Sequence, residues 1–463
     1  MDDVEVDFGE TTGPFERLSG VQGSPAPLLE GEPDLTEAFR AARIASCRID
    51  QDCAPNTLTL GGVFPHEDAD VDAAGSYRFD ALDRHVRAAR AAGAGVLWQA
   101  SYDVGQSDAW VGFNLGGRPP ENLVRWGRVV TKCLEHFNGD FASGLGGAVG
   151  HVEFLNEPDG LGGFHGPHAG RLERAFVTFL DVVARFNQAH PASAVQAVGP
   201  GVPLSWAEWA DYEPRFAALL RAVKGWGRTL PVFSFHTYGA DVSPRGNQRL
   251  AVALRALLDR NGFPDTALWN TEWQAGDFLR QHVGVDADKV ARATPDELRA
   301  YAAGFATYAL ACKLRWQGVV RGSYYYRANA RVFPPGYRPP LPAVGLARFF
   351  GTDGRPGPLA QQEAVLARVA EATSLRCATR FDDDGLLAVQ ALRSQDGRAV
   401  SVVAANLSLR PRTLRLRPRG TTGPMTGTRL TLDGRGLTES AVDAADDVAL
   451  APLASAWLRV GAA

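Results

Sequence analysis

The chain has 463 residues, more than one hydrophobic core usually organises, so its length favours a large domain with a smaller companion. Hydrophobic residues make up 45% of the chain and charged residues 22%, which is ordinary for a globular protein and excludes a wholly disordered or fibrous chain. The formal net charge is −4, and the sequence contains neither a polybasic run nor an apolar run of membrane-spanning length, so we expect no nucleic-acid partner and no membrane partner.

The N-terminus is acidic, because Met1 is followed by Asp2, Asp3, Val4 and Glu5. A secretory signal would need a basic segment and then an apolar one. We therefore expect a cytoplasmic protein, or a secreted one if the sequence starts at a mature N-terminus. The five cysteines form no CxxC pair and no regular framework, which argues against a disulfide scaffold.

Short apolar runs alternate with amphipathic helical segments from about residue 15 to residue 350. This alternation is typical of repeated βα units and a parallel sheet. Eight segments are predicted to be strands of that sheet: residues 17–23, 45–50, 95–100, 150–156, 195–199, 231–236, 266–271 and 318–325. Between them, residues 79–92 show a helical hydrophobic pattern, and Thr294 followed by Pro295 predicts an N-cap and the first position of a helix.

Eight βα units can close into a barrel, in which the functional residues come from the C-terminal ends of the strands. Periodicity alone also fits a large open sheet, but no GxGxxG or Walker-type loop follows the first predicted strand, as it often does in the cofactor-binding open sheets. We therefore predict an α/β fold with a (β/α)8 TIM barrel over residues 1–355, and we expect no cofactor.

The sequence changes character after about residue 355. Residues 351–358 are rich in glycine and proline, and the later segments alternate apolar and polar residues with a period of two. The predicted strands of this part are residues 386–392, 399–406, 413–417, 429–432 and 455–460. We therefore predict a small antiparallel β-sandwich domain over residues 356–463. Residues 4–8 also alternate, so residues 1–14 are a candidate strand of that domain.

Two of the predicted barrel strands end in a glutamate. The fourth ends in Asn-Glu-Pro at residues 156–158, and the seventh ends in Thr-Glu-Trp at residues 271–273. Proline cannot continue a strand ladder, so Glu157 is expected at the very rim of the sheet, and Glu272 occupies the equivalent place on its own strand. Hydrolysis of a glycosidic bond needs one carboxyl group that protonates the leaving oxygen and a second that attacks the anomeric carbon or activates water. This pair could supply both.

These motifs resemble those of the clan of retaining (β/α)8-barrel glycosidases, and most of all those of glycoside hydrolase family 39, which contains β-xylosidases and α-L-iduronidases. Residues 153–158 resemble the family's E-x-x-N-E-P motif, and residues 234–238 resemble its H-x-Y motif on the sixth strand. The likeness extends over about residues 15 to 350, with weaker support from the trailing β domain. It implies that Glu157 is the general acid/base, Glu272 the nucleophile and Asn156 a ligand of the sugar 2-hydroxyl group.

Five more residues are candidates for substrate binding. Arg48 resembles the arginine that steadies the nucleophile in the family, and His236 and Tyr238 would line the floor of the same site. Trp273 and Tyr325 are aromatic residues at strand ends, where they could stack on a sugar ring. Each has a plain structural alternative, because Arg48 could be an ion-pair partner and the others could be satisfied core residues.

The sequence departs from the family's pattern at three places. Asp50 stands where the family's xylosidases often carry histidine. No tryptophan occurs at the position of Phe164 and His165, and the three tyrosines Tyr324 to Tyr326 occupy a place where a tryptophan is expected. These departures leave the catalytic pair intact and bear on the choice of substrate.

The sequence therefore predicts a retaining, β-xylosidase-like O-glycosyl hydrolase that cleaves an oligosaccharide or glycoside by double displacement. The alternatives are an α-L-iduronidase, an arabinosidase or an endo-acting glycosidase with the same catalytic pair, and a non-catalytic carbohydrate-binding barrel. A metal-dependent barrel hydrolase is a further rival, but His165 and His168 have no third ligand at a convincing spacing, so we expect no metal. A uronate would need a basic clamp, for which Arg327 and Arg331 are the candidates.

Overall fold

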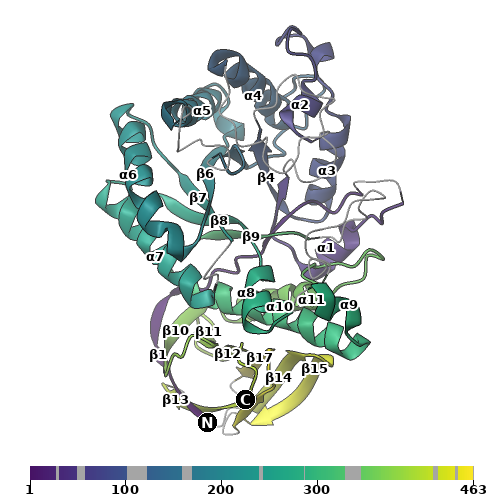
Figure 1. Ribbon diagram of the computed structural model, residues 1–463, viewed down its shortest axis with the longest axis vertical. Coiled ribbons are helices and arrows are strands. Elements are labelled where there is room, and N and C mark those ends of the chain that lie inside the picture. Colours follow the sequence, from purple (N-terminus) through teal and green to yellow (C-terminus); the bar gives the residue numbers. More distant parts are fainter. Residues whose placement is uncertain are drawn as a thin grey trace.

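The chain forms a closed barrel and a curled β-sheet that lies against one side of it (Figure 1). The computed structural model describes residues 1–27, 31–49, 58–101, 122–158, 169–238, 243–285, 287–328, 346–420, 426–443 and 447–461. The predicted fold class, a TIM barrel followed by a smaller β domain, is confirmed.

Eight parallel strands close the barrel in their order along the chain, from β2 to β9. Their bounds are β2 Gly20–Gln22, β3 Ser46–Ile49, β4 Gly95–Ala100, β5 His151–Phe154, β6 Gln196–Leu204, β7 Val232–Thr237, β8 Ala267–Trp273 and β9 Gly322–Tyr325. Each strand overlaps a predicted one, because strands buried on both faces read as short apolar runs. Strand β6 continues five residues beyond the predicted end at residue 199, because a bulge between Pro200 and Val202 lets the pairing with β7 resume after the proline.

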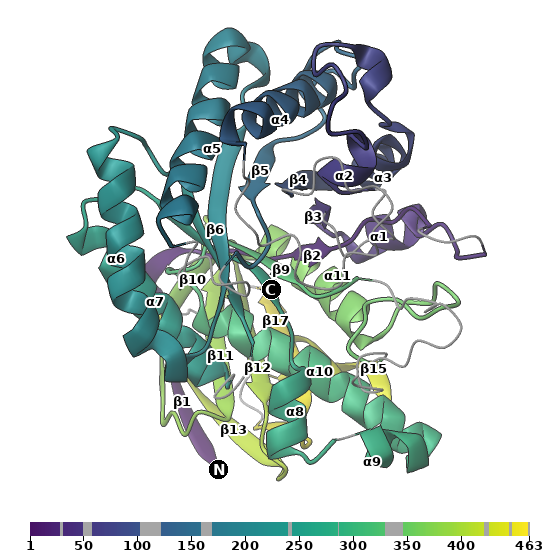
Figure 2. The ribbon, with the colours of Figure 1, turned by 45° about the horizontal axis from the view of Figure 1, so that its top comes forward.

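Helices cover the outside of the barrel on all sides of the strands (Figure 2). Their bounds are α1 Thr36–Ala42, α2 Leu60–Val63, α3 Asp80–Ala91, α4 Leu123–Asn138, α5 Ala169–Ala189, α6 Trp209–Gly225, α7 Pro244–Arg260, α8 Gly276–His282, α9 Ala287–Arg292, α10 Pro295–Arg315 and α11 Pro358–Ala372. The predicted helix start at Thr294 is confirmed, since its hydroxyl accepts from the backbone of Glu297 and the glutamate side chain bonds back to Thr294. Among the described helices, none combines the length and the hydropathy needed to cross a bilayer.

The second unit is one nine-stranded sheet in the order β15-β14-β17-β12-β11-β10-β1-β13-β16. Its strands are β1 Asp2–Pro14, β10 Leu375–Phe381, β11 Leu387–Arg393, β12 Ala399–Asn406, β13 Arg412–Arg419, β14 Thr426–Asp433, β15 Gly436–Asp443, β16 Val448–Leu450 and β17 Ala454–Gly461. The N-terminal strand β1 joins this sheet, as the alternation of residues 4–8 suggests. Because β1 runs antiparallel to β10 but parallel to β13, the sheet is mixed rather than purely antiparallel.

Helix α10 lies between the barrel and the sheet and is covered by both (Figure 1). Residues 303–315 of this helix are all buried, so this part of it has no solvent-exposed face. The two faces of strand β11 pack into two different hydrophobic cores. Val389 and Ala391 pack into the core of the sheet itself, whereas Ala388 and Leu392 point the other way and join the core around the barrel.

Helix α11 begins at Pro358, within the glycine- and proline-rich segment where the sequence changes character. It packs against α1 and α10 of the barrel, and it also contacts β15 and β17 of the sheet. The two units are therefore joined by packed helices and strands rather than by a loose linker. The four cysteines in the described part of the chain are all buried: Cys47, Cys133, Cys312 and Cys377.

Candidate active site

Polar side chains fill the inside of the barrel beneath its C-terminal rim. Successive residues of a strand point to opposite faces, so every second residue of a barrel strand points inward. Glu153 of β5 is hydrogen-bonded to Arg48 of β3 and to Ser234 of β7, although these strands are not neighbours. All three side chains therefore lie inside the barrel, and all three are completely buried. They come from alternate strands, as the layers of other (β/α)8 barrels do.

The guanidinium group of Arg48 binds three acceptors at once. Its Nε donates to Oε2 of Glu153 at 2.6 Å, its Nη1 to Oε2 of Glu272 at 2.7 Å, and its Nη2 to Oδ1 of Asn156 at 2.8 Å. A guanidinium group is planar and presents its donors in a fixed fork. Arg48 therefore fixes these three side chains relative to one another.

Glu272 lies near the end of β8, where the pairing of this strand with both of its neighbours is irregular. Its Oε2 accepts from Arg48 and, at 3.3 Å, from Nε2 of Gln22, while its Oε1 accepts from the hydroxyl of Tyr238 at 2.9 Å. Donors on both oxygens stabilise the charged form of a carboxyl group. Since Glu272 is only 6% exposed, these side chains rather than solvent surround its charge.

The Tyr238 hydroxyl remains protonated in this environment. Burial raises the pKa of Tyr238 well above its ordinary value, and the neighbouring carboxyl group of Glu272 raises this pKa further. A phenolate at this position would be poorly solvated and would face a negative charge. Tyr238 is therefore a hydrogen-bond donor to Glu272 and not a base.

Glu157 follows β5 in a backbone conformation that is uncommon for a residue with a side chain, with φ of 44°. Its N–H donates to the carbonyl oxygen of Gly201 at 3.1 Å, at the bulge of β6. Its Oε1 lies 2.9 Å from Nδ1 of the buried His236. The side chain of Glu157 is 21% exposed, so the backbone and His236 direct its carboxyl group while leaving it accessible.

The two rim carboxyl groups meet. An oxygen of Glu157, an oxygen of Glu272 and a ring nitrogen of His236 all lie within 4.8 Å of one another. One of these carboxyl groups is surrounded by donors that favour its charge, and the other is partly open. Such a pair can supply a nucleophile and a proton donor to one bond, and the same three groups could also bind a divalent cation.

Six of the sequence-predicted site residues come together at this point: Glu157, Glu272, Asn156, Arg48, His236 and Tyr238. The other two lie behind the strands. Trp273 and Tyr325 are at most 1% exposed and pack edge to face with each other, with ring centroids 5.0 Å apart. Trp273 also packs against Trp316. This burial favours the packing alternative for both, and their contact with a sugar stays a prediction. Asp50, His165, His168 and Arg331 lie outside the described residues.

The sequence interpretation did not assign site roles to Gln22, Glu153 and Ser234. Each is a polar residue inside a short apolar strand, and this was the signal that could have identified them. A polar residue in such a strand needs a buried partner. Without the register of the barrel, however, the sequence does not show that these residues share its interior.

Next to Tyr238, the ring of Tyr326 lies close to two arginine side chains. The ring of Tyr326 meets that of Tyr238 nearly at a right angle, with centroids 6.3 Å apart. The guanidinium carbons of Arg327 and Arg348 lie 5.1 Å and 5.4 Å from the centroid of the Tyr326 ring. Both arginines are at most 5% exposed. The first of them is a residue that the sequence suggested for a basic clamp.

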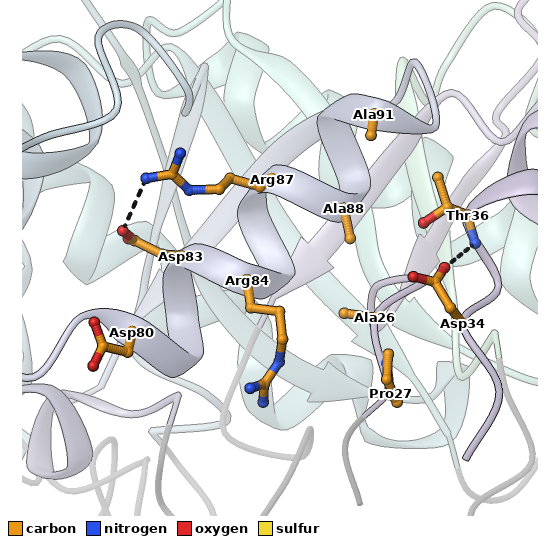
Figure 3. Close-up of a pocket in the computed structure, with 10 residues that line it drawn as sticks. All are labelled: Ala26, Pro27, Asp34, Thr36, Asp80, Asp83, Arg84, Arg87, Ala88 and Ala91. Carbon is orange, nitrogen blue, oxygen red and sulfur yellow. Dashed lines mark hydrogen bonds and ion pairs between the residues drawn. The ribbon is translucent and has the colours of Figure 1, made fainter. Parts of the chain in front are cut away.

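A separate surface hollow of about 650 Å³ lies against α3, and none of the site residues lines it (Figure 3). Its wall carries both signs of charge, with Asp83 and Arg87 of α3 paired to each other and Asp34 bonded to the backbone of Thr36. These polar groups already have partners within the protein. The hollow is thus separate from the rim of the barrel, where the site residues lie.

No protein-family model and no curated protein matches the chain. Solved structures match it over its whole length. A glucosidase from Croceicoccus marinus has a TM-score of 0.72 at 21% identity and covers 100% of this chain and 99% of its own. A GH39 β-xylosidase from Caulobacter crescentus has a TM-score of 0.63 at 17% identity, with 99% of each chain covered. An α-L-arabinofuranosidase from Thermotoga maritima has a TM-score of 0.65 at 14% identity, with 100% of each covered. At these identities the similarity is one of fold. The chain has the barrel-and-sheet fold of these enzymes, and the predicted resemblance to family 39 agrees with this fold.

Proposed function

We propose that this protein is a retaining glycosidase, with Glu272 as the nucleophile and Glu157 as the general acid/base. The observation that carries the proposal is the approach of their carboxyl oxygens to within 4.8 Å. Retaining enzymes hold their two carboxyl groups about 5–5.5 Å apart, whereas inverting enzymes keep about 6.5–9.5 Å to admit a water molecule. The shared fold with a glucosidase, a β-xylosidase and an α-L-arabinofuranosidase supports a glycosidic substrate.

The donors around each carboxyl group assign the roles. Glu272 accepts from Arg48 and Tyr238 and is poised as a carboxylate, so it attacks the anomeric carbon. Glu157 gives its proton to the departing oxygen, and a glycosyl ester forms on Glu272. Glu157 then takes a proton from the water molecule that attacks the ester. Two inversions leave the anomeric configuration unchanged.

Asn156 is placed to bind the sugar beside the nucleophile. Because its Oδ1 accepts from Arg48 at 2.8 Å, the NH2 end of the amide is turned away from the guanidinium group. This end supplies a donor for the sugar 2-hydroxyl group. A hydrogen bond at that hydroxyl that strengthens in the transition state would contribute to the rate.

The substrate that we propose is a β-xyloside, with an arabinoside, an iduronide and an internal linkage of an oligosaccharide as alternatives. A panel of nitrophenyl glycosides, with a glucoside and a glucuronide added, distinguishes the exo-acting possibilities. The glucuronide and iduronide test the two buried arginines on Tyr326, since a uronate would need a cation near the sugar. Reducing-end release from xylan and arabinan tests endo action.

Azide rescue tests the assignment of the two glutamates. Glu272→Ala should abolish turnover, and azide should restore it by attacking the anomeric carbon directly, which gives a glycosyl azide of inverted configuration. Glu157→Ala should keep activity on substrates with acidic leaving groups, and azide should then give a product of retained configuration. Near-native activity of Glu272→Ala would refute the proposed mechanism.

The cluster of Glu157, His236 and Glu272 also fits a metal-dependent hydrolase. Against this alternative, Arg48 places a cation on Glu272 at 2.7 Å, where a second cation would be repelled. We expect full activity after EDTA treatment and dialysis, and loss of activity that zinc or manganese restores would favour the metal enzyme. A non-catalytic barrel would bind sugars in calorimetry without cleaving any member of the panel.

A further inference from the structure

We propose that Glu153 is a positioning residue whose charge, acting through Arg48, sets the ionisation of the nucleophile Glu272; this inference rests on the proposed function. Glu153 lies within β5, below the rim that carries Glu157, and it is completely buried. It therefore does not touch a substrate. Any effect that it has on the reaction must pass through the side chains that it contacts.

Both oxygens of Glu153 are held. Oε1 accepts from the hydroxyl of Ser234 at 2.9 Å, and Oε2 accepts from Nε of Arg48 at 2.6 Å. The same guanidinium group donates to Glu272 through Nη1 at 2.7 Å. Two carboxylates thus share one buried cation through different nitrogens.

This sharing limits how strongly Arg48 stabilises the charge of Glu272. With Glu153 ionised, part of the positive charge of the guanidinium group is offset on its other side. If that carboxylate were neutral, Arg48 would act on Glu272 alone and would favour its charged form more strongly. An overstabilised carboxylate is a weaker nucleophile, because nucleophilicity falls with basicity. Glu153 therefore keeps Glu272 both ionised and reactive.

Arg48 connects Glu153 with Glu272, and two other titratable groups lie near Glu153. On β9, burial raises the pKa of Tyr324, and Glu153 adds to that rise, so Tyr324 is neutral. On β7, His236 lies across Gly201 from Glu153: a Cβ on that glycine would be 3.5 Å from Oε1 of Glu153 and 3.7 Å from Nε2 of His236. The other ring nitrogen of His236 lies 2.9 Å from Oε1 of the general acid/base, Glu157.

The test is Glu153→Gln, which keeps the shape of the side chain and can still accept from Arg48, but removes the charge. The titration midpoint of Glu272 is read by carbon-13 NMR of protein labelled at the glutamate carboxyl carbon, with Glu272→Gln identifying the signal. We expect the midpoint to fall by about one pH unit. The acidic limb of kcat/KM should move down by the same amount, and kcat should fall more than KM changes.

Asp83→Asn is the matched control, because it also neutralises a carboxyl group with a short hydrogen-bonding contact, to His136 at 2.7 Å, but on the outer wall of the barrel. It should leave the midpoint of Glu272 unchanged. If Glu153→Gln does not fold, Glu153→Asp is the second variant. Its shorter side chain keeps the negative charge but holds it farther from Arg48, so the midpoint of Glu272 should fall by less than one pH unit. An unchanged midpoint in a folded Glu153 variant would overturn the inference. The NMR readout needs no turnover, so an inactive wild type would refute only the proposed function.

Discussion

The hydroxyl of Tyr238 donates to Oε1 of Glu272 at 2.9 Å, while Arg48 donates to the other oxygen of the same carboxyl group. Replacing Tyr238 by Phe keeps the ring and removes the first of these donors. A hydrogen bond to a charged group contributes about 1.5–3 kcal/mol. We therefore expect Tyr238→Phe to lower kcat/KM on an aryl glycoside about 10- to 100-fold while the protein remains folded by circular dichroism.

The pH profile of the same variant separates hydrogen bonding from proton transfer. Because burial raises the pKa of Tyr238 well above its ordinary value, the hydroxyl keeps its proton throughout the range in which the enzyme works. The alkaline limb of kcat/KM should therefore be the same in Tyr238→Phe and the wild type. Loss of a donor to the charged carboxylate should move the acidic limb to higher pH. Disappearance of the alkaline limb in the variant would show that Tyr238 titrates.

A glycine carbonyl on β6 positions the general acid/base. Gly201 has φ of 67° and accepts from the backbone of Glu157, and a Cβ at Gly201 would lie 3.2 Å from the carbonyl oxygen of Leu155. Forcing a side chain into the left-handed region costs about 1–2 kcal/mol. We expect Gly201→Ala to lower the stability by about that amount and to lower kcat by shifting Glu157.

Leaving-group dependence shows whether the loss comes from the acid/base. A dinitrophenyl glycoside needs little protonation at its leaving oxygen, so Gly201→Ala should impair it less than a methyl glycoside. The matched control is Gly225→Ala at the end of α6, where an added Cβ meets nothing within 4 Å and φ is not positive. Equal losses on both substrates would contradict a role of Gly201 in positioning Glu157.

The sequence predicted a structural feature correctly where a short local pattern determines that feature. Strand ends mark the rim of a barrel, which is why the sequence alone predicts that Glu157 and Glu272 form a pair. It was uninformative where a partner is distant. The sequence shows that the N-terminus is acidic, but it does not show which residues face these acidic side chains. In the fold, Asp3 and Glu5 of β1 face Arg417 and Arg419 of the parallel strand β13, at 3.3 Å and 3.8 Å.

The interior of the barrel shows the same limit. Arg48 was predicted because it resembles an arginine at a known motif, but the closed sheet shows Glu153 as its partner and Ser234 as the partner of Glu153. A shift of the strand register by one residue would turn either side chain outward. The sequence does not fix the register to one residue, so it could not connect these three strands.

A buried ion pair joins the two helices between the barrel and the sheet. Lys313 of α10 binds Glu363 of α11, with side-chain exposures of 3% and 0%. Burial lowers the pKa of Lys313, while Glu363 opposes this effect. Glu363→Gln would leave a buried ammonium group without its counter-charge, and we expect a loss of about 3–5 kcal/mol in the free energy of unfolding.

A double-mutant cycle tests this account of Lys313 and Glu363. Lys313→Met removes the cation, so the double variant Lys313→Met/Glu363→Gln should recover most of the stability lost in Glu363→Gln. Urea denaturation of the four proteins gives the coupling. Strictly additive losses would mean that the pair contributes through packing alone.

A second ion pair connects the end of α10 with the sheet and is sensitive to acid. Both terminal nitrogens of Arg315 donate to Asp383, at 2.8 Å and 2.5 Å. These hydrogen bonds lower the pKa of Asp383 below its ordinary value of 3.8. The folded state then binds a proton less readily than the unfolded state, so the stabilisation is complete above pH 3.8 and is lost as the pH falls through the lower folded value.

Asp383→Asn should therefore lower the free energy of unfolding near pH 7 and have progressively less effect below about pH 4. The Asp383 side chain is 37% exposed, so solvent weakens the pair, and we expect a loss below about 1 kcal/mol. Chemical denaturation at pH 7, 4 and 3 measures it, with Asp259→Asn, which breaks an exposed pair with Arg255 on α7, as the control for loss of a surface charge. An effect of Asp383→Asn that stays constant down to pH 3 would show that the side chain contributes through its shape, since protonation of the unfolded state below pH 3.8 should by then have reduced any contribution of its charge.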